Sequence, residues 1–244
     1  MNAQTAIMNE DEWNDYLSFQ MKKEHMADDE EWATRVAEQG LLILKNEGPK
    51  NAIHFFTSTA YVFAKMIELD TENLIPEEVK CKYALFHYDT EGDLFPQICE
   101  TVRQAGKYRP ADWDKKMPAV MRGRKAYYVY RGGSESIDEA NNRISWSLSR
   151  DVAEFFIYRK SFFDREPQHL YRGIIDADKI ISYNNDRTEF EVLQDNSVRN
   201  IEELPIEGQN EEFKRLKKTG SVRSKQKMER LICDRAEFVE DNLK

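Results

Sequence analysis

The chain has 244 residues, of which 40% are hydrophobic and 11% aromatic, a globular composition that excludes a wholly disordered protein. No apolar run approaches the roughly 18 to 20 residues that cross a membrane, and the polar first residues do not resemble a signal peptide, so we expect a cytoplasmic protein with no membrane partner. Three cysteines without metal-ligand spacing predict neither a disulfide framework nor a metal site.

The net charge of −9 is unevenly distributed along the chain. Residues 1–100 hold 20 acidic against 8 basic side chains, whereas residues 101–244 hold 25 against 28. A basic block near the C-terminus is interpreted as a solvated helix face, although it is compatible with a polyanion. The block consists of Lys214, Arg215, Lys217, Lys218, Arg223, Lys225, Lys227 and Arg230.

The first hundred residues predict helices. Helical spacing of apolar residues, acidic first turns and Gly or Pro at the ends indicate these segments. They cover residues 13–21, 28–44, 52–69, a helix that begins near Pro76, and 94–105.

The pattern changes near Tyr108, beyond which short aromatic and β-branched runs predict strands. The strands cover 127–130, 144–148, 170–175, 180–183 and 188–193, with a helix over 151–163 and a helical tail over 211–218 and 224–242. Helices followed mostly by strands predict an α+β fold. We place an acidic helical region at residues 1–106 and a second domain at 107–244.

Two carboxylates lie close together in the last predicted strand. Residues i and i+2 of a strand point to the same face, so Glu189 and Glu191 are expected to share one environment. Two neighbouring anions repel, and burial of either is unfavourable without a partner. The arrangement therefore favours a site where positive charge develops during a reaction.

Two earlier strands carry polar residues of their own. Arg131 and Gly132 end the first, where a guanidinium fork suits phosphate and glycine admits a ligand to the backbone. Ser145 and Ser147 share one face of the next, and Ser149 or Asp151 is expected to cap the following helix. Taken alone, an arginine beside a glycine turn is usually a surface residue, and each serine favours a structural role over a functional one.

In this order, Arg131, Ser145-Trp146-Ser147 and Glu189-Phe190-Glu191 resemble the arginine–serine–glutamate class of ADP-ribosyltransferases. The resemblance implies a split β-sandwich with flanking helices, NAD as co-substrate, no metal, and a mono-ADP-ribosyltransferase acting as a toxin or effector. The sequence departs from the family in having Trp where well-known members have Thr, and in the fourteen-residue step from Arg131 to Ser145. Family order selects Arg131 over Arg172, which also stands in a Tyr-Arg-Gly sequence.

The resemblance assigns roles residue by residue. Arg131 would hold the NAD phosphates or the adjoining ribose, and the Gly132 backbone would bind the nicotinamide carboxamide. Ser145, Trp146 and Ser147 would form the cofactor-binding strand. Ser145 would orient Glu191, which would stabilise the cation formed as nicotinamide leaves. Acceptor recognition would fall to Tyr183, interpreted as an exposed loop residue, to Arg187 and to Glu189.

The acceptor is left open between two classes. The resemblance implies a protein arginine as acceptor, because family members with Glu at the position of Glu189 usually modify arginine. The basic C-terminal block and the positive second half of the chain leave RNA or DNA as the alternative acceptor, as for an intracellular phage-defence toxin. Two further alternatives are an NAD glycohydrolase and a non-enzymatic binding module, the latter expected only if Arg131, Ser145 and Glu191 lie apart in the fold. An antitoxin or chaperone partner is expected to restrain such a toxin.

Overall fold

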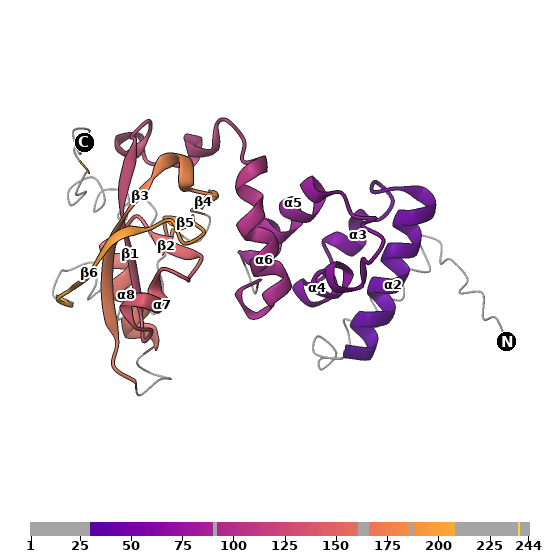
Figure 1. Cartoon of the computed structure of the whole chain (residues 1–244), viewed down its shortest axis with the longest axis horizontal. Helices are drawn as coiled ribbons and strands as arrows, with labels where there is room; N and C mark the ends of the chain where they lie inside the picture. The colour runs from indigo at the N-terminus through magenta and orange to yellow at the C-terminus, as the bar shows by residue number, and fades with distance from the viewer. Residues whose placement is uncertain (1–29, 90–91, 161–165, 186–187, 208–238, 240–244) are drawn as a thin grey trace. The chain divides into compact units, whose positions relative to one another are not determined.

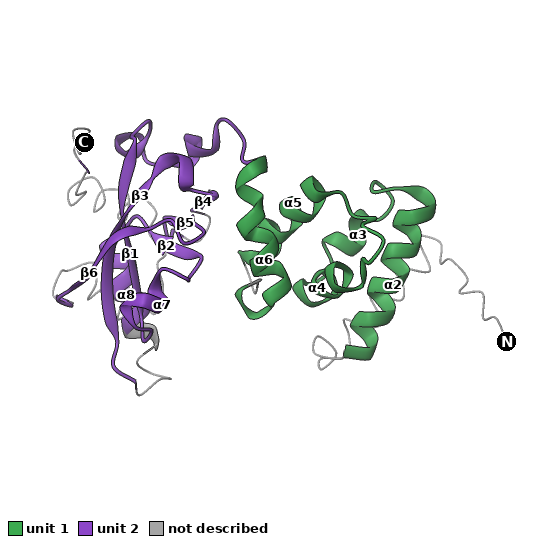
Figure 2. Ribbon diagram, in the orientation of Figure 1, with its two compact units in different colours: residues 1–108 green, residues 109–244 purple. Residues whose placement is uncertain are grey.

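The computed structural model describes residues 30–89, 92–160, 166–185, 188–207 and 239. The chain divides into two compact units, residues 1–108 and 109–244 (Figure 2). The expected boundary, between 106 and 107, lies beside this division. The predicted helices at 13–21, 211–218 and 224–242, the basic block and Arg187 lie outside the described residues.

The described part of the first unit is helical (Figure 1). Its elements are α2 (Glu30–Glu47), α3 (Ile53–Phe56), α4 (Ala60–Leu69), α5 (Glu77–Tyr88), η1 (Gly92–Leu94), α6 (Pro96–Gln104) and η2 (Ala105–Tyr108). Gly48, at a positive φ of 86°, follows α2 as predicted, because glycine adopts this conformation at little cost. No helix among the described residues combines the length and apolarity needed to cross a bilayer.

The predicted helix at 52–69 is two helices. Thr59 adopts an extended conformation, and its hydroxyl accepts a hydrogen bond from the Val62 N–H at 3.1 Å, which caps α4. The Thr57 hydroxyl donates to the Ile53 carbonyl at 3.1 Å. Such local side-chain bonds compete with the helix ladder, and they break a segment whose apolar spacing is otherwise helical.

The second unit contains a six-stranded antiparallel sheet in the order β4-β5-β2-β1-β3-β6. The strands are β1 (Ala126–Gly133), β2 (Ser145–Ser147), β3 (His169–Asp176), β4 (Ser182–Asn184), β5 (Glu191–Leu193) and β6 (Arg199–Leu204). The other elements are η3 (Trp113–Lys116), η4 (Ala119–Met121), α7 (Ile137–Ala140), α8 (Arg150–Lys160) and η5 (Ala177–Lys179). Helices followed by an antiparallel sheet confirm the predicted α+β class.

The sheet is weakly paired at its centre. β1 and β3 pair over eight consecutive positions, whereas β1 and β2 share the single register pair Tyr130 and Ser147. The sheet therefore consists of two three-stranded halves, β4-β5-β2 and β1-β3-β6, that meet at one point.

Helix α8 packs against β1. A Cβ atom at Gly132 would lie 2.2 Å from the Ala153 carbonyl oxygen, so glycine permits this close approach. Of the two candidate caps, Ser149 has the role, because its hydroxyl accepts from the Val152 N–H at 3.4 Å. Together these contacts fix the chain immediately after β2.

Candidate functional site

Ser145 connects Arg131 to Glu191. Its carbonyl oxygen accepts a hydrogen bond from Arg131 Nη1 at 2.6 Å, and its hydroxyl donates to Glu191 Oε1. The three residues come from β1, β2 and β5, and they form one continuous hydrogen-bonded cluster at the junction of the two half-sheets. The scatter that would have excluded catalysis is not observed.

The ionisable groups of this cluster are largely shielded from water. Glu191 is 7% exposed, and the Arg131 side chain is 16% exposed. Because a buried carboxylate is unfavourable unless it accepts hydrogen bonds, the Ser145 hydroxyl both stabilises and orients Glu191. The cluster thus holds an acceptor-only group and a guanidinium in a region of low effective dielectric, where each acts strongly on a charged ligand.

The prediction that Glu189 and Glu191 share the face of one strand is wrong. β5 begins only at Glu191, and Glu189 lies between Thr188 and Phe190, whose φ angles are 64° and 50°. These two residues have left-handed backbone, which interrupts the strand and with it the side-chain alternation on which the prediction rested. Glu191 is therefore buried in the ladder, whereas Glu189 lies outside it and is partly exposed.

Anchoring of Phe190 supports this irregular backbone. Its ring is fully buried, its N–H donates to Asn185 Oδ1 at 3.2 Å, and its carbonyl accepts from the Leu148 N–H at 2.9 Å. Left-handed backbone costs about 1 to 2 kcal/mol per residue, and full burial of a Phe side chain contributes about 1.5 to 3 kcal/mol. The burial and the hydrogen bonds together offset the conformational cost.

Each serine of the motif positions one glutamate. Ser147 donates from its hydroxyl to the Glu189 carbonyl oxygen at 2.6 Å and accepts from the Ser149 N–H at 3.0 Å. Ser145 fixes the Glu191 side chain, and Ser147 fixes the Glu189 backbone. The pair of serines therefore fixes the Glu191 carboxylate and the backbone that carries Glu189.

Two other predicted residues lie in the core. Trp146 is 2% exposed, on the face of β2 opposite the serines, and its indole N–H donates to the Arg143 carbonyl at 3.1 Å. Because side chains alternate along a strand, Trp146 must point away from the face that carries Ser145 and Ser147. The expectation that it contacts the cofactor overlooked this alternation. Tyr183 belongs to the same hydrophobic core cluster as Trp146 and is 6% exposed, so the expectation of an exposed ring is wrong.

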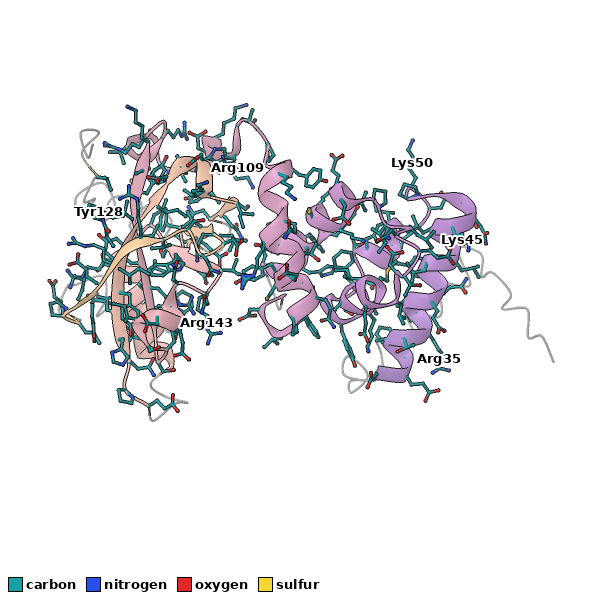
Figure 3. All side chains as sticks on the ribbon, in the orientation of Figure 1. Arg35, Lys45, Lys50, Arg109, Tyr128 and Arg143 are labelled. Carbon is teal, nitrogen blue, oxygen red and sulfur yellow. The ribbon has the colours of Figure 1, made fainter. Side chains whose placement is uncertain are left out.

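Glu135 was not predicted as a site residue. Its Oε1 atom accepts from Arg131 Nε at 2.6 Å, lies 2.5 Å from Arg131 Nη2 and lies 3.5 Å from Arg143 Nε. Arg143, labelled in Figure 3, belongs to the loop between α7 and β2, and its side chain is 59% exposed. The sequence around Glu135 is typical of a polar turn, and its four-residue spacing from Arg131 is the signal that could have indicated this local ion pair.

Arg172, the arginine of the second Tyr-Arg-Gly sequence, lies in β3 and pairs with β6. Its guanidinium lies 2.5 Å from Glu202 Oε1 and stacks 4.8 Å from the centroid of the Tyr128 ring. The ion pair joins β3 to β6, away from Ser145.

The chain matches no family model, no curated protein and no solved structure. Within the described ranges, no group of three or more His, Cys, Asp or Glu side chains is arranged to hold a metal ion. The functional argument therefore depends on the geometry of the cluster.

Proposed function

We propose that the protein cleaves the nicotinamide–ribose bond of NAD and transfers ADP-ribose to a macromolecular acceptor. The observation that carries this proposal is that Ser145 joins Arg131 and Glu191 in one hydrogen-bonded cluster. The single-pair junction between the half-sheets supports a split β-sandwich arrangement.

The chemistry assigns each group a step. Arg131 binds a phosphate of NAD through its remaining N–H donors. The C–N bond breaks, its electron pair leaves with nicotinamide, and positive charge develops on the ribosyl C1 atom. Glu191 stabilises that charge, and its fixed orientation means that little reorganisation is needed in the transition state.

Glu189 serves the acceptor. It lies outside the β5 ladder and is partly exposed, in contrast to the buried Glu191, so the two carboxylates suit different partners. A protein arginine is the acceptor we favour, because its guanidinium forms paired hydrogen bonds with a carboxylate. Its nitrogen attacks C1 and its proton passes to Glu189.

The proposal is tested with NAD labelled in its adenylate half, incubated with cell extract or with purified RNA. We expect label in protein, together with release of one nicotinamide per transfer. Glu191→Gln should lower both nicotinamide release and transfer by about 10²- to 10³-fold, whereas Glu189→Gln should lower mainly transfer.

Glu202→Gln is the matched control, because it removes a carboxylate from an Arg–Glu pair remote from Ser145. Wild-type rates in Glu191→Gln would reject the site. Label confined to nucleic acid would reject the protein acceptor, and nicotinamide release without any labelled acceptor would identify a glycohydrolase.

A further inference from the structure

We infer that Glu135 is a positioning residue that holds the Arg131 guanidinium for a dianionic ligand such as a pyrophosphate, and that Gly133 is glycine to make room for it. The inference rests on the proposed function for the identity of the ligand, NAD. The arrangement itself rests on contacts of the described residues.

Glu135 binds Arg131 along one edge. A single oxygen, Oε1, lies within 2.6 Å of Nε and 2.5 Å of Nη2, and Nη1 donates to the Ser145 carbonyl. These contacts account for three of the five N–H donors of the guanidinium. One N–H remains on each Nη atom, and adjacent Nη donors match the oxygen spacing of a phosphate.

The Glu135 side chain is buried, and a neighbouring phenol holds its backbone. The Glu135 side chain is 4% exposed, and the Tyr171 hydroxyl donates to the Glu135 carbonyl at 2.8 Å. Buried ion pairs are weak sources of stability, because desolvation opposes the attraction. The buried Arg131–Glu135 pair is therefore better explained by a need to fix the arginine than by a gain in stability.

Glu135 does not by itself neutralise the two guanidinium groups beside it. Arg143 Nε lies 3.5 Å from the same Glu135 oxygen, so two guanidinium groups share one carboxylate. The trio carries one net positive charge, since arginine stays protonated. Glu135 thus orients Arg131 without cancelling its attraction for a phosphate.

Gly133 provides independent geometric support. A Cβ atom at this position would lie 1.9 Å from Glu135 Oε2 and 2.6 Å from its Cδ. The φ angle of Gly133 is not among the positive ones, so the backbone itself tolerates alanine. Gly133→Ala should therefore displace the Glu135 carboxylate without altering its chemistry.

The experiment measures steady-state NAD cleavage and, separately, calorimetric binding of inorganic pyrophosphate to the 244-residue protein at low salt. We expect Glu135→Gln and Gly133→Ala each to raise the KM for NAD and the Kd for pyrophosphate by at least about tenfold, the effect of one lost charged hydrogen bond. The kcat should change less than about twofold, because Glu191 is untouched. Glu202→Gln should match the wild type.

A double-mutant cycle distinguishes positioning from loss of fold. In a Glu135→Ala background, Gly133→Ala should add no further loss, since the carboxylate it displaces is gone. Thermal unfolding of every variant identifies any that does not fold. If an alanine variant does not fold, the KM and Kd of Glu135→Gln are compared with those of Glu202→Gln to test the positioning role. Unchanged or lower KM and Kd in Glu135→Gln would overturn the inference.

The two readouts separate this inference from the proposed function. If the protein binds pyrophosphate in a Glu135-dependent way but does not cleave NAD, the positioning role stands and the proposed reaction is rejected. NAD cleavage that depends on Arg131 but not on Glu135 would retain the reaction and reject the positioning role. Binding of neither ligand by the wild type would reject both.

Discussion

At the level of single residues, the division of labour between the two motif serines follows from hydrogen-bond capacity. A hydroxyl donates one hydrogen bond, and each serine directs that donor to a different glutamate. Ser145 acts on a carboxylate, and Ser147 acts on a backbone carbonyl. Ser145→Ala and Ser147→Ala should therefore have different effects on activity.

Ser145→Ala should lower kcat for nicotinamide release by about 10- to 100-fold, because a hydrogen bond to a charged group contributes about 1.5 to 3 kcal/mol. The KM for NAD should change little, since the Ser145 carbonyl that accepts from Arg131 remains. Ser147→Ala, the matched variant, should reduce transfer more than nicotinamide release. Equal losses of both activities in the two variants would contradict this assignment.

Tyr171 predicts a pH dependence of stability. Burial, followed by the charges of Glu203, Glu135 and Glu139, raises the pKa of its phenol. A raised folded-state pKa means that its contribution is complete below the unfolded pKa of about 10 and is lost as the pH rises through the folded value. The free energy of unfolding of Tyr171→Phe should thus fall less steeply above about pH 10 than that of the wild type.

Urea titrations at several pH values measure this slope. Tyr108→Phe, at an exposed ring, is the control. Parallel slopes for Tyr171→Phe and the wild type would show that the phenol does not contribute to the alkaline loss.

At the level of elements, the sequence predicted strands wherever β-branched and aromatic residues dominate, as in β1 and β3. It missed β6, whose residues Arg199–Leu204 are mainly polar and exposed and pair at the edge of the sheet. It extended β5 through Thr188–Phe190, because tertiary contacts of Phe190 decide the left-handed backbone there. Glu135 was missed because its polar turn carries no motif, although it lies only four residues after Arg131. Arg131, Ser145 and Glu191 were grouped by their order in the sequence, and the structure joins them by hydrogen bonds.

Gly132→Ala tests the packing of α8 on β1. The new methyl group would lie 2.2 Å from the Ala153 carbonyl and 2.6 Å from Ile157 Cγ1, so helix backbone must shift. Overpacking of this kind costs about 1 to 3 kcal/mol, which should lower the urea midpoint of the second unit.

Gly123→Ala is a contrasting control. Its φ is 69° and no atom lies within 4 Å of the added carbon, so it measures backbone strain alone. If Gly132→Ala is no more destabilising than this variant, close packing is not the reason for glycine at position 132.

At the level of the whole molecule, every described residue of the candidate site belongs to the second unit. The larger core cluster of this unit also contains only residues beyond position 108. We therefore expect residues 109–244, produced alone, to unfold cooperatively and to retain nicotinamide release within about threefold of the full chain, since domains with their own core fold independently.

Circular dichroism and nicotinamide release measure these two properties. A folded fragment without activity, beside an active full chain, would show that residues 1–108 contribute to the reaction. Loss of transfer alone would assign acceptor recognition to the helical unit.

The Arg131 contact with the Ser145 carbonyl has an evolutionary consequence. Because β1 and β2 share only one register pair, the Arg131 side chain supplies a second link between the half-sheets. Selection for folding would then preserve the arginine even in a descendant that lacked the proposed activity. In a relative of this chain, the presence of Ser145 and Glu191 would therefore indicate the proposed activity better than the presence of Arg131.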